Sequence, residues 1–476
     1  MKIARLRLTA LLLCLTALAG CVAATTLPPT TSATEAPTTT AETTATTEAP
    51  YVYDPIAVSD AVLTEERLSF KFFWEVANGD PESVGYGMVS DRYNYASGTY
   101  SVASVASIGF GLSALPAGVA NDWINLEEGY QRARGTLETM LSLTRTHGFF
   151  FHFLNMSNGG RAWNSEVSII DTAILVCGAI TAGEYFGGEV ETLAEELAST
   201  VEWDWYYNAA TDLFYMGYTP EHGFGGSWNM YAEQLMVYIL AAGSLDHQVG
   251  KEAYDRMKSL ATRKSYGTSG VFYNSPAGTL FTYQFSHAWF DSASMLDADG
   301  VDWFENSRRA SIAAYEYAVA ASQSYRTLSS VSWGLTASDG PDGYNGSYGN
   351  LPSNGGNVND GTLAPCGAIG SIPFVPDLVI PAIEHYASIP ALQGRYGFRD
   401  AYNLGLTEAA LPSVRRPIAA IPANGWYDTD VIGIDKGVTV LMIENYRSGL
   451  IWHLFMKDAS VRRGLEALGF TARTQA

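Results

Sequence analysis

Apolar residues recur at helical spacing along most of the chain, in segments that follow one another at intervals of roughly 25–40 residues. The pattern predicts helices at 57–78, 102–115, 124–146, 168–186, 189–200, 228–243, 247–263, 303–324, 375–387, 397–405, 436–448 and 455–468. Some of these, such as 228–243, are apolar on every side, whereas 303–324 is more amphipathic. This alternation favours an all-α fold, an (α/α)6 toroid of helical hairpins with an inner and an outer ring.

Three long connections rich in Gly, Asn and Tyr interrupt the helical pattern, at 148–165, 264–300 and 326–372. Loops of that length inside a compact domain are usually functional. In a toroid they would form the rim of a central cleft. Because no composition break divides 57–476, we expect that range to be one domain, although it exceeds the usual single-core size.

The N-terminus has the pattern of a secretion signal. Lys2, Arg5 and Arg7 precede an apolar run at 8–18 that is too short to span a membrane. Residues 18–21 (LAGC) resemble the lipobox of bacterial lipoproteins, in which the cysteine is lipidated. We therefore expect a signal peptide at 1–20 and a lipid on Cys21; an ordinary signal peptide with a chance cysteine is the alternative.

A linker rich in Thr and Pro follows the signal. Twelve of the 26 residues at 25–50 are Thr and four are Pro, a composition that cannot bury a core. We expect residues 21–56 to be a disordered stalk that holds the protein at the cell surface, outside the cytoplasm, with the lipid as its contact with the membrane. The net charge of −21 becomes −24 once the signal is removed, which argues against nucleic acid and favours a neutral polymer such as a glucan.

Carboxylates stand beside aromatic residues repeatedly between residues 163 and 360, which suggests carbohydrate chemistry. Sugar rings stack on aromatic faces, and glycosidic hydrolysis usually needs one carboxylic acid and one carboxylate. The alternative is an aromatic core with surface acids. The residues expected to bind substrate on this basis are Trp163, Trp228, Tyr231, His287, Trp289 and Asp291.

Three carboxylates are the main catalytic candidates. Glu233 lies in the middle of the apolar segment 228–243, where an ionised carboxylate is costly unless it faces a cavity or a partner. An acid with a raised pKa in such a place suits a glycosidase general acid. Asp171 and Glu166 stand near the start of the helix expected at 168–186, although Ser168 and Asp171 also have the spacing of a capping box.

Two further acids have turn chemistry and could supply the second carboxylate. They are Asp339, followed by Gly340, and Asp360, followed by Gly361. The sequence does not show which acids face one another. Both are kept among the residues expected to bind substrate.

Other chemistries find little support in the sequence. The glycine pattern at 109–114 lacks a strand–helix–strand unit, 297–300 lacks the closing acid of an EF-hand, and the seven histidines have no metal-ligand spacing. We therefore expect no cofactor and no metal. Cys177 lies in an apolar run and is expected to be a buried small residue, with a disulfide to Cys366 left open.

A set of motifs resembles the glucoamylase-like domain of bacterial endo-β-1,2-glucanases. The motifs are Asp171-Thr172-Ala173, Trp203-Asp204-Trp205, Trp228 with Glu233, Tyr238–Ala241, Phe304–Ser307, Trp333–Asp339, Asp360–Thr362, Gly397–Asn403 and Ile443–Arg447. The resemblance implies an (α/α)6 toroid and inverting hydrolysis of a β-glucan, most simply β-1,2-glucan. It matches Glu233 and Asp171 to acids of the family, and adds Trp333 to the expected substrate contacts.

The chain departs from the glucanase pattern at two positions. That pattern has acids seven and three residues before the position of Asp171, where this chain has Asn164 and Ser168. Another β-glucan linkage, or transfer in place of hydrolysis, therefore stays open. The leading hypothesis is a monomeric, surface-tethered glycoside hydrolase; a non-catalytic glycan-capture lipoprotein and a polysaccharide lyase are the rivals.

Overall fold

The computed structural model describes residues 51–98, 100–406 and 425–473. The chain divides into two units, Met1–Pro50 and Tyr51–Ala476. The signal peptide, Cys21 and the stalk up to residue 50 lie outside the described residues. The following description concerns the unit that begins at Tyr51.

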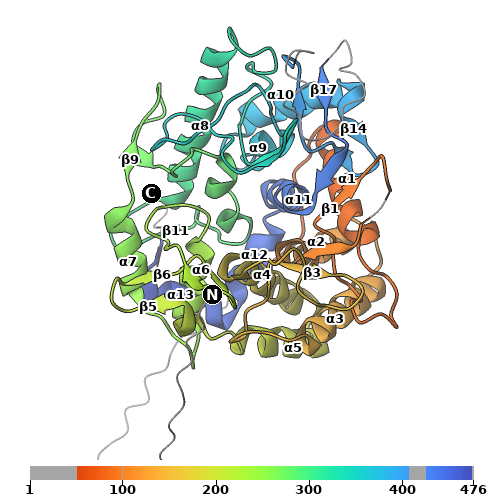
Figure 1. The fold of residues 1–476 in the computed structure, drawn as a ribbon, viewed down its shortest axis with the longest axis vertical. Coiled ribbons are helices and arrows are strands. Elements are labelled where there is room, and N and C mark those ends of the chain that lie inside the picture. Colours follow the sequence, from red (N-terminus) through yellow and green to blue (C-terminus); the bar gives the residue numbers. More distant parts are fainter. Residues whose placement is uncertain (1–50, 99, 407–424, 474–476) are drawn as a thin grey trace, which may run out of the picture. The chain divides into compact units, whose positions relative to one another are not determined.

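Helices make up most of the regular structure (Figure 1). They are α1 (Asp60–Glu75), α2 (Val105–Ala120), α3 (Leu126–Ser142), α4 (Ile169–Phe186), α5 (Gly188–Ser199), α6 (Leu235–Gly243), α7 (Lys251–Leu260), α8 (Trp303–Ala321), α9 (Pro365–Ile369), α10 (Pro376–Ala387), α11 (Gly433–Arg447), α12 (Leu450–Lys457) and α13 (Ala459–Leu468). Nearly every residue of α2, α4, α6 and α11 is buried, whereas α3, α5, α7 and α13 each bury one face. The predicted all-α toroid, with inner and outer helices, is confirmed.

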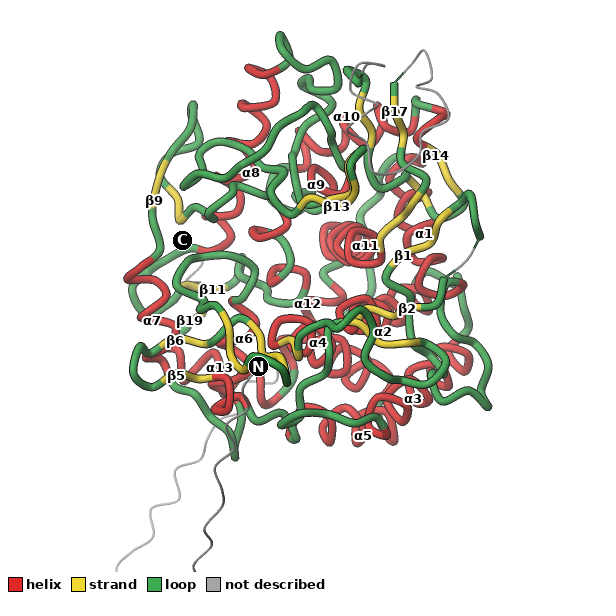
Figure 2. Tube along the Cα trace, in the orientation of Figure 1, coloured by secondary structure: helices red, strands yellow, loops and turns green. Residues whose placement is uncertain are grey.

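The strands are short segments between the helices (Figure 2). They are β1 (Arg92–Asn94), β2 (Val102–Ser104), β3 (Phe153–Asn155), β4 (Val167–Ser168), β5 (Tyr207–Asn208), β6 (Leu213–Phe214), β7 (Gly217–Thr219), β8 (Gly223–Gly225), β9 (Arg263–Lys264), β10 (Phe272–Tyr273), β11 (Met295–Leu296), β12 (Ser338–Gly340), β13 (Gly343–Asn345), β14 (Gln393–Gly394), β15 (Gly397–Phe398), β16 (Tyr402–Asn403), β17 (Trp426–Tyr427), β18 (Asp430–Ile432) and β19 (Thr471–Ala472).

Strand pairing ties together the N-terminal ends of three inner helices. β18, which leads into α11, pairs with β1, and Ser90 just before β1 bridges to Ala103 in β2. β2 leads into α2 and pairs with β3, and Phe151 just before β3 bridges to Val167 in β4, which leads into α4. These antiparallel pairings hold the segments before α2, α4 and α11 side by side.

Three of the predicted helices are wrong in part or in whole. The segment 455–468 is divided at Asp458, where α12 ends and where the side chain of Asp458 caps α13. The segment 228–243 becomes helical only at Leu235, because the side chain of Gln234 bonds the backbone of Met230 and Ala232 and so closes a turn. The segment 397–405 contains β15 and β16 in place of a helix. Gly397 has a positive φ of 84° there, a conformation that ends helical geometry, and the N–H of Phe398 donates to Glu65.

Helix α4 is long and apolar enough to cross a membrane, but 78% of it is buried inside the protein. Its composition therefore reflects a position in the core of the toroid, packed against α2 and α5. Cys177 in this helix is buried and free, as predicted, and Cys366 is also free. The disulfide between them is not formed.

Candidate active site

Glu233 lies directly before the N-terminal end of α6, and not in the middle of a helix as predicted. The residue is half-buried, and its backbone carbonyl accepts a hydrogen bond from the hydroxyl of Ser286. Protein atoms desolvate the carboxyl group, and the nearby charge of Asp171 acts in the same direction, so that the pKa of Glu233 rises to about 7. A carboxyl group that is accessible and still protonated near neutral pH can act as a proton donor.

Asp171 and Glu166 meet at one histidine. His152 places Nδ1 3.0 Å from Oε1 of Glu166 and Nε2 3.4 Å from Oδ1 of Asp171. Ser168, the N-cap of α4, accepts the Asp171 N–H at 3.1 Å and donates its hydroxyl to Oδ2 of the same residue at 2.5 Å. Asp171 therefore belongs to the helix cap, as the spacing of Ser168 and Asp171 allowed. It is also a partner of His152.

The charges of this cluster separate the pKa values of its acids. Burial works against the imidazolium of His152, but Asp171, Glu166 and Asp91 together raise its pKa to about 9. In return, the hydrogen bond from His152 lowers the pKa of Glu166, whereas burial raises the pKa of Asp171. Glu166 is consequently ionised at neutral pH, whereas Glu233, with a pKa of about 7, retains its proton in a large fraction of the molecules.

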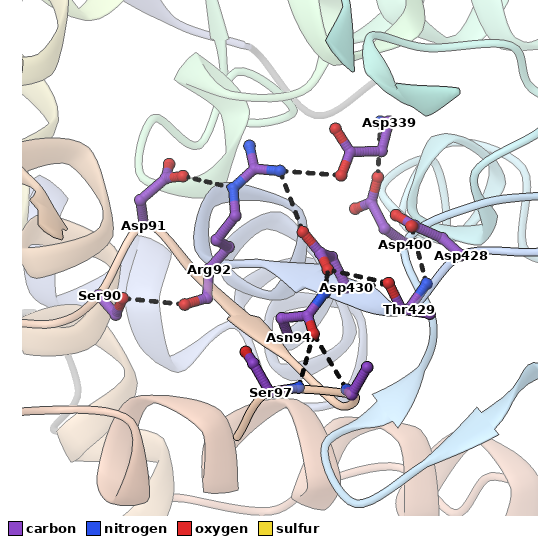
Figure 3. A network of polar contacts seen from close by, with 11 residues as sticks. Ser90, Asp91, Arg92, Asn94, Ser97, Asp339, Asp400, Asp428, Thr429 and Asp430 are labelled. Carbon is purple, nitrogen blue, oxygen red and sulfur yellow. Dashed lines mark hydrogen bonds and ion pairs between the residues drawn. The ribbon is translucent and has the colours of Figure 1, made fainter. Parts of the chain in front are cut away.

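A second acidic network lies next to this cluster, centred on Arg92 at the start of β1 (Figure 3). Its guanidinium contacts Asp91 at 2.8 Å, Asp339 at 2.8 Å and Asp430 at 3.3 Å. Asp91 also acts on His152, so the two clusters are electrostatically continuous. Asp339 and Asp430 lie 247 and 338 residues after Arg92 in the chain, so the network joins segments that are distant in sequence.

Two buried acids, Asp400 and Asp435, form the deepest part of the Arg92 network. Asp400 accepts the backbone N–H of Asp339 at 2.8 Å. Burial and the neighbouring carboxylate of Asp435 raise the pKa of Asp400 well above its usual range. The pKa of Asp435 rises to about 6, again chiefly through burial. The pair therefore retains a proton at neutral pH, which limits the charge that must be buried there.

Trp163 is held outward on a strained loop. It is 63% exposed, and both Trp163 and Asn164 have a positive φ of 52°. Arg161 fixes this loop by donating to the carbonyls of Ser165 and Asn164 at 2.6 and 2.8 Å. Strain of this kind persists only where surrounding contacts enforce it, and it is frequent at functional sites. The exposed indole is placed as a sugar-stacking residue would be.

The other predicted aromatic contacts lie in the core, so their assignment to substrate is corrected. Trp228 is only 3% exposed, and Tyr231 stacks on Trp303 with 5.0 Å between ring centroids. The Nε1 of Trp289 donates to Ser113 at 2.8 Å, and the Nε1 of Trp333 donates to the carbonyl of Leu378 at 3.2 Å. His287 lies between the hydroxyls of Ser292 and Ser307. These rings are enclosed by protein and offer no face to a ligand.

The three predicted aspartates have different surroundings. Asp291 accepts the N–H of Ala293 within a turn, and exposed Asp360 accepts the hydroxyl of Tyr348 and the N–H of Thr362 at 2.8 Å each. Both have the turn role that the sequence left open. Asp339 belongs to the Arg92 network and is fully buried.

Two groups in the described part of the chain bring three potential metal ligands within 4.8 Å of one another. One is His152, Glu166 and Asp171, and the other is Asp339, Asp400 and Asp428. Either group could supply ligands to a cation, although Arg92 already contacts Asp339. The absence of a metal stays a prediction.

Residues 226–459 match the Glycoamylase family, described as “Putative glucoamylase”. This part of the chain is similar to the glucoamylase-like domain. The matched range contains Glu233, Asp339, Asp400 and the whole of α11, while β4 and α4, with Glu166 and Asp171, lie before it.

The chain is also similar to proteins of defined activity. The chain is 26% identical over 455 residues to the exo beta-1,2-glucooligosaccharide sophorohydrolase (non-reducing end) of Parabacteroides distasonis, covering 85% of this chain and 58% of that protein. Among solved structures, the endo-beta-1,2-glucanase of Chitinophaga pinensis with sophorotriose and glucose has 27% identity and a TM-score of 0.73, over 87% of this chain and 99% of that one.

A further solved structure supports the fold alone. The beta-1,2-glucanase of Parabacteroides distasonis is 23% identical, with a TM-score of 0.72 over 87% of this chain and 60% of that one. The domain therefore shares its toroid with proteins that act on β-1,2-linked glucose polymers.

Proposed function

We propose that this protein is a glycoside hydrolase that cleaves a β-glucan, most simply one with β-1,2 linkages. The observation that carries the proposal is a cluster of carboxyl groups with separated pKa values, in which Asp171 acts on Glu233 and shares His152 with Glu166. Glu233 has a pKa of about 7, and the pKa of Glu166 is lowered by His152. Acid and base roles at neutral pH require such a separation.

In the proposed reaction Glu233 is the general acid and Glu166 the general base. Glu233 gives its proton to the glycosidic oxygen as the bond from that oxygen to C1 breaks. Glu166 takes a proton from a water molecule that attacks C1 from the opposite face, and the product is released with inverted configuration. Asp171 acts through its neighbours, by fixing His152 and by favouring the protonated form of Glu233.

The likeness to the sophorohydrolase and to the endo-β-1,2-glucanase supports the choice of linkage. The charge of the site agrees with a neutral substrate, because the clustered carboxylates would repel an anionic polysaccharide. The same charge argues against a lyase that acts on acidic sugars.

We further propose that the hydrolase acts outside the cytoplasm, tethered to the membrane by a lipid on Cys21. The lipobox at 18–21 and the Thr- and Pro-rich segment 25–50 support this. Cys21→Ser should release the protein from the membrane fraction and leave the turnover of the soluble protein unchanged. A Cys21→Ser variant that still sediments with membranes would show that the tether lies elsewhere.

The function is tested by incubating the protein without its signal, residues 22–476, with linear and cyclic glucans of β-1,2, β-1,3, β-1,4 and β-1,6 linkage. Chromatography of the products should show short oligosaccharides from β-1,2-glucan. Binding of a glucan in calorimetry, with no product after prolonged incubation, would contradict hydrolysis and leave a capture protein. New longer chains would indicate transfer.

A further inference from the structure

The hairpin of β12 and β13 carries an aromatic residue, Tyr344, into the Arg92 network. The strands pair with Ser338 opposite Asn345, Asp339 opposite Tyr344 and Gly340 opposite Gly343. Directly paired residues of an antiparallel hairpin project from the same face, with Cβ atoms about 5 Å apart. Tyr344 therefore stands beside Asp339, the residue that contacts Arg92 at 2.8 Å.

Tyr344 is more exposed than the acid with which it is paired. The residue is 49% exposed, whereas Asp339 has no exposed surface. Desolvation by the surrounding protein, followed by the charges of Asp435, Asp400 and Asp91, raises the pKa of the Tyr344 hydroxyl well above its usual value. The ring is therefore partly open to solvent and lies near three buried acids. Asp435, one of these acids, lies in the first turn of α11.

The surroundings of Tyr344 have the composition of a sugar subsite. The flat ring offers an apolar face, and Arg92 and Asp91 offer hydrogen-bond donors and acceptors nearby. A pyranose has the complementary surface, with axial C–H bonds on one face and hydroxyl groups around its edge. An isolated apolar ligand would leave Arg92 and Asp91 without new partners, and an anionic ligand would meet the carboxyl groups of the Arg92 network.

We propose that Tyr344 is a stacking platform for one neutral pyranose unit of the glucan, whose hydroxyl groups reach Arg92 and Asp91. This inference rests on the proposed hydrolase and extends its cleft from the Glu166, Asp171 and Glu233 cluster to the Arg92 network. Trp163 and Tyr344 then belong to different parts of one cleft. Tyr344 contributes to substrate binding and has no role in proton transfer.

The test compares Tyr344→Phe, Tyr344→Leu and Tyr344→Ala in the signal-less protein, with Leu126→Ala on the outer helix α3 as the control for loss of an exposed apolar side chain. Calorimetry with β-1,2-gluco-oligosaccharides of two to seven units is carried out in a Glu233→Gln background, so that the ligand is not consumed. We expect Tyr344→Phe and Leu126→Ala to bind as the background protein does. Tyr344→Leu and Tyr344→Ala should bind roughly tenfold more weakly, but only oligosaccharides long enough to reach the platform.

The outcomes separate the platform from the hydrolase. Unchanged binding by Tyr344→Ala, or full binding by Tyr344→Leu, overturns the platform, while turnover by the wild type would still support the hydrolase. Length-dependent loss of binding in a protein that never releases product supports the platform and contradicts the hydrolase. A wild type that neither binds nor cleaves these oligosaccharides contradicts both. Equal loss of binding at every length, with a lowered melting temperature, would assign Tyr344 to the fold and overturn the platform.

Discussion

Replacing Glu233 by Gln keeps the shape of the side chain and removes its proton. General acid catalysis contributes about 10²- to 10⁴-fold, so we expect kcat to fall at least about a hundredfold, equivalent to about 2.7 kcal/mol in the transition state. The size of this loss in kcat should depend on pH, because the pKa of Glu233 sets the fraction of wild-type enzyme that carries the proton. With a pKa of about 7, Glu233 is almost fully protonated at pH 5, where the deficit appears at full size. At pH 9 only about 1% of the wild-type enzyme carries the proton, so the gap between the two proteins should narrow.

The assay for this variant uses two substrates. One is a β-1,2-gluco-oligosaccharide, and the other is an aryl glycoside whose nitrophenol leaving group departs without a proton. A missing general acid should slow the first substrate far more than the second. Glu305→Gln on α8 is the matched control, because Glu305 is paired with Arg309 in an ordinary helix ion pair. Near-normal turnover of the oligosaccharide, or an equal loss on both substrates, would refute the assignment of Glu233.

Other consequences of the site can be measured independently. The pH profile of kcat/KM should have an alkaline limb near pH 7 from Glu233 and an acid limb below pH 4.5 from Glu166; an alkaline limb well below pH 6 would contradict the raised pKa. His152→Gln should move the acid limb upward towards 4.5, because Glu166 loses the hydrogen bond that favours its ionised form. The charged form of His152 stabilises the fold fully below about pH 6.5, and this contribution is lost as the pH rises through about 9. The difference in melting temperature between wild type and His152→Gln should therefore shrink between these pH values. A constant difference would contradict the raised pKa of His152. Trp163→Ala should weaken oligosaccharide binding by roughly 1–3 kcal/mol with little change in melting temperature. Trp228→Ala should lower the free energy of unfolding by about 3–5 kcal/mol, because its ring is buried. The reverse pattern in binding and denaturation assays would contradict the exposure of Trp163 and the burial of Trp228.

The architecture could be predicted from the sequence because the helical period is a local signal. Inner helices such as α4 are apolar on all sides, and that property depends only on residues a few positions apart. The start of α6 could not be predicted in this way. The first residue of α6 depends on hydrogen bonds of the Gln234 side chain, and the spacing of apolar residues does not reveal these bonds.

Residues of the candidate site could be predicted only where they stand out from the local sequence. Glu233 stands out because it interrupts an apolar run, and Asp171 because it follows the cap residue Ser168. His152 and Arg92 have no such signal. Each is defined by partners brought close in space, as when Arg92 meets Asp430 across 338 positions of the chain. Trp228 illustrates the opposite error, since an aromatic residue near an acid in sequence can equally belong to the core.

We propose that Glu233 and Glu166 hydrolyse a β-glucan with inversion. Proton NMR of the first products released from a β-1,2-gluco-oligosaccharide tests this proposal before mutarotation mixes the anomers. We expect the α-anomer of the new reducing end to appear first and the β-anomer to follow at the rate of mutarotation. Initial release of the β-anomer would contradict the acid and base roles assigned here, and no release at all would contradict the hydrolase.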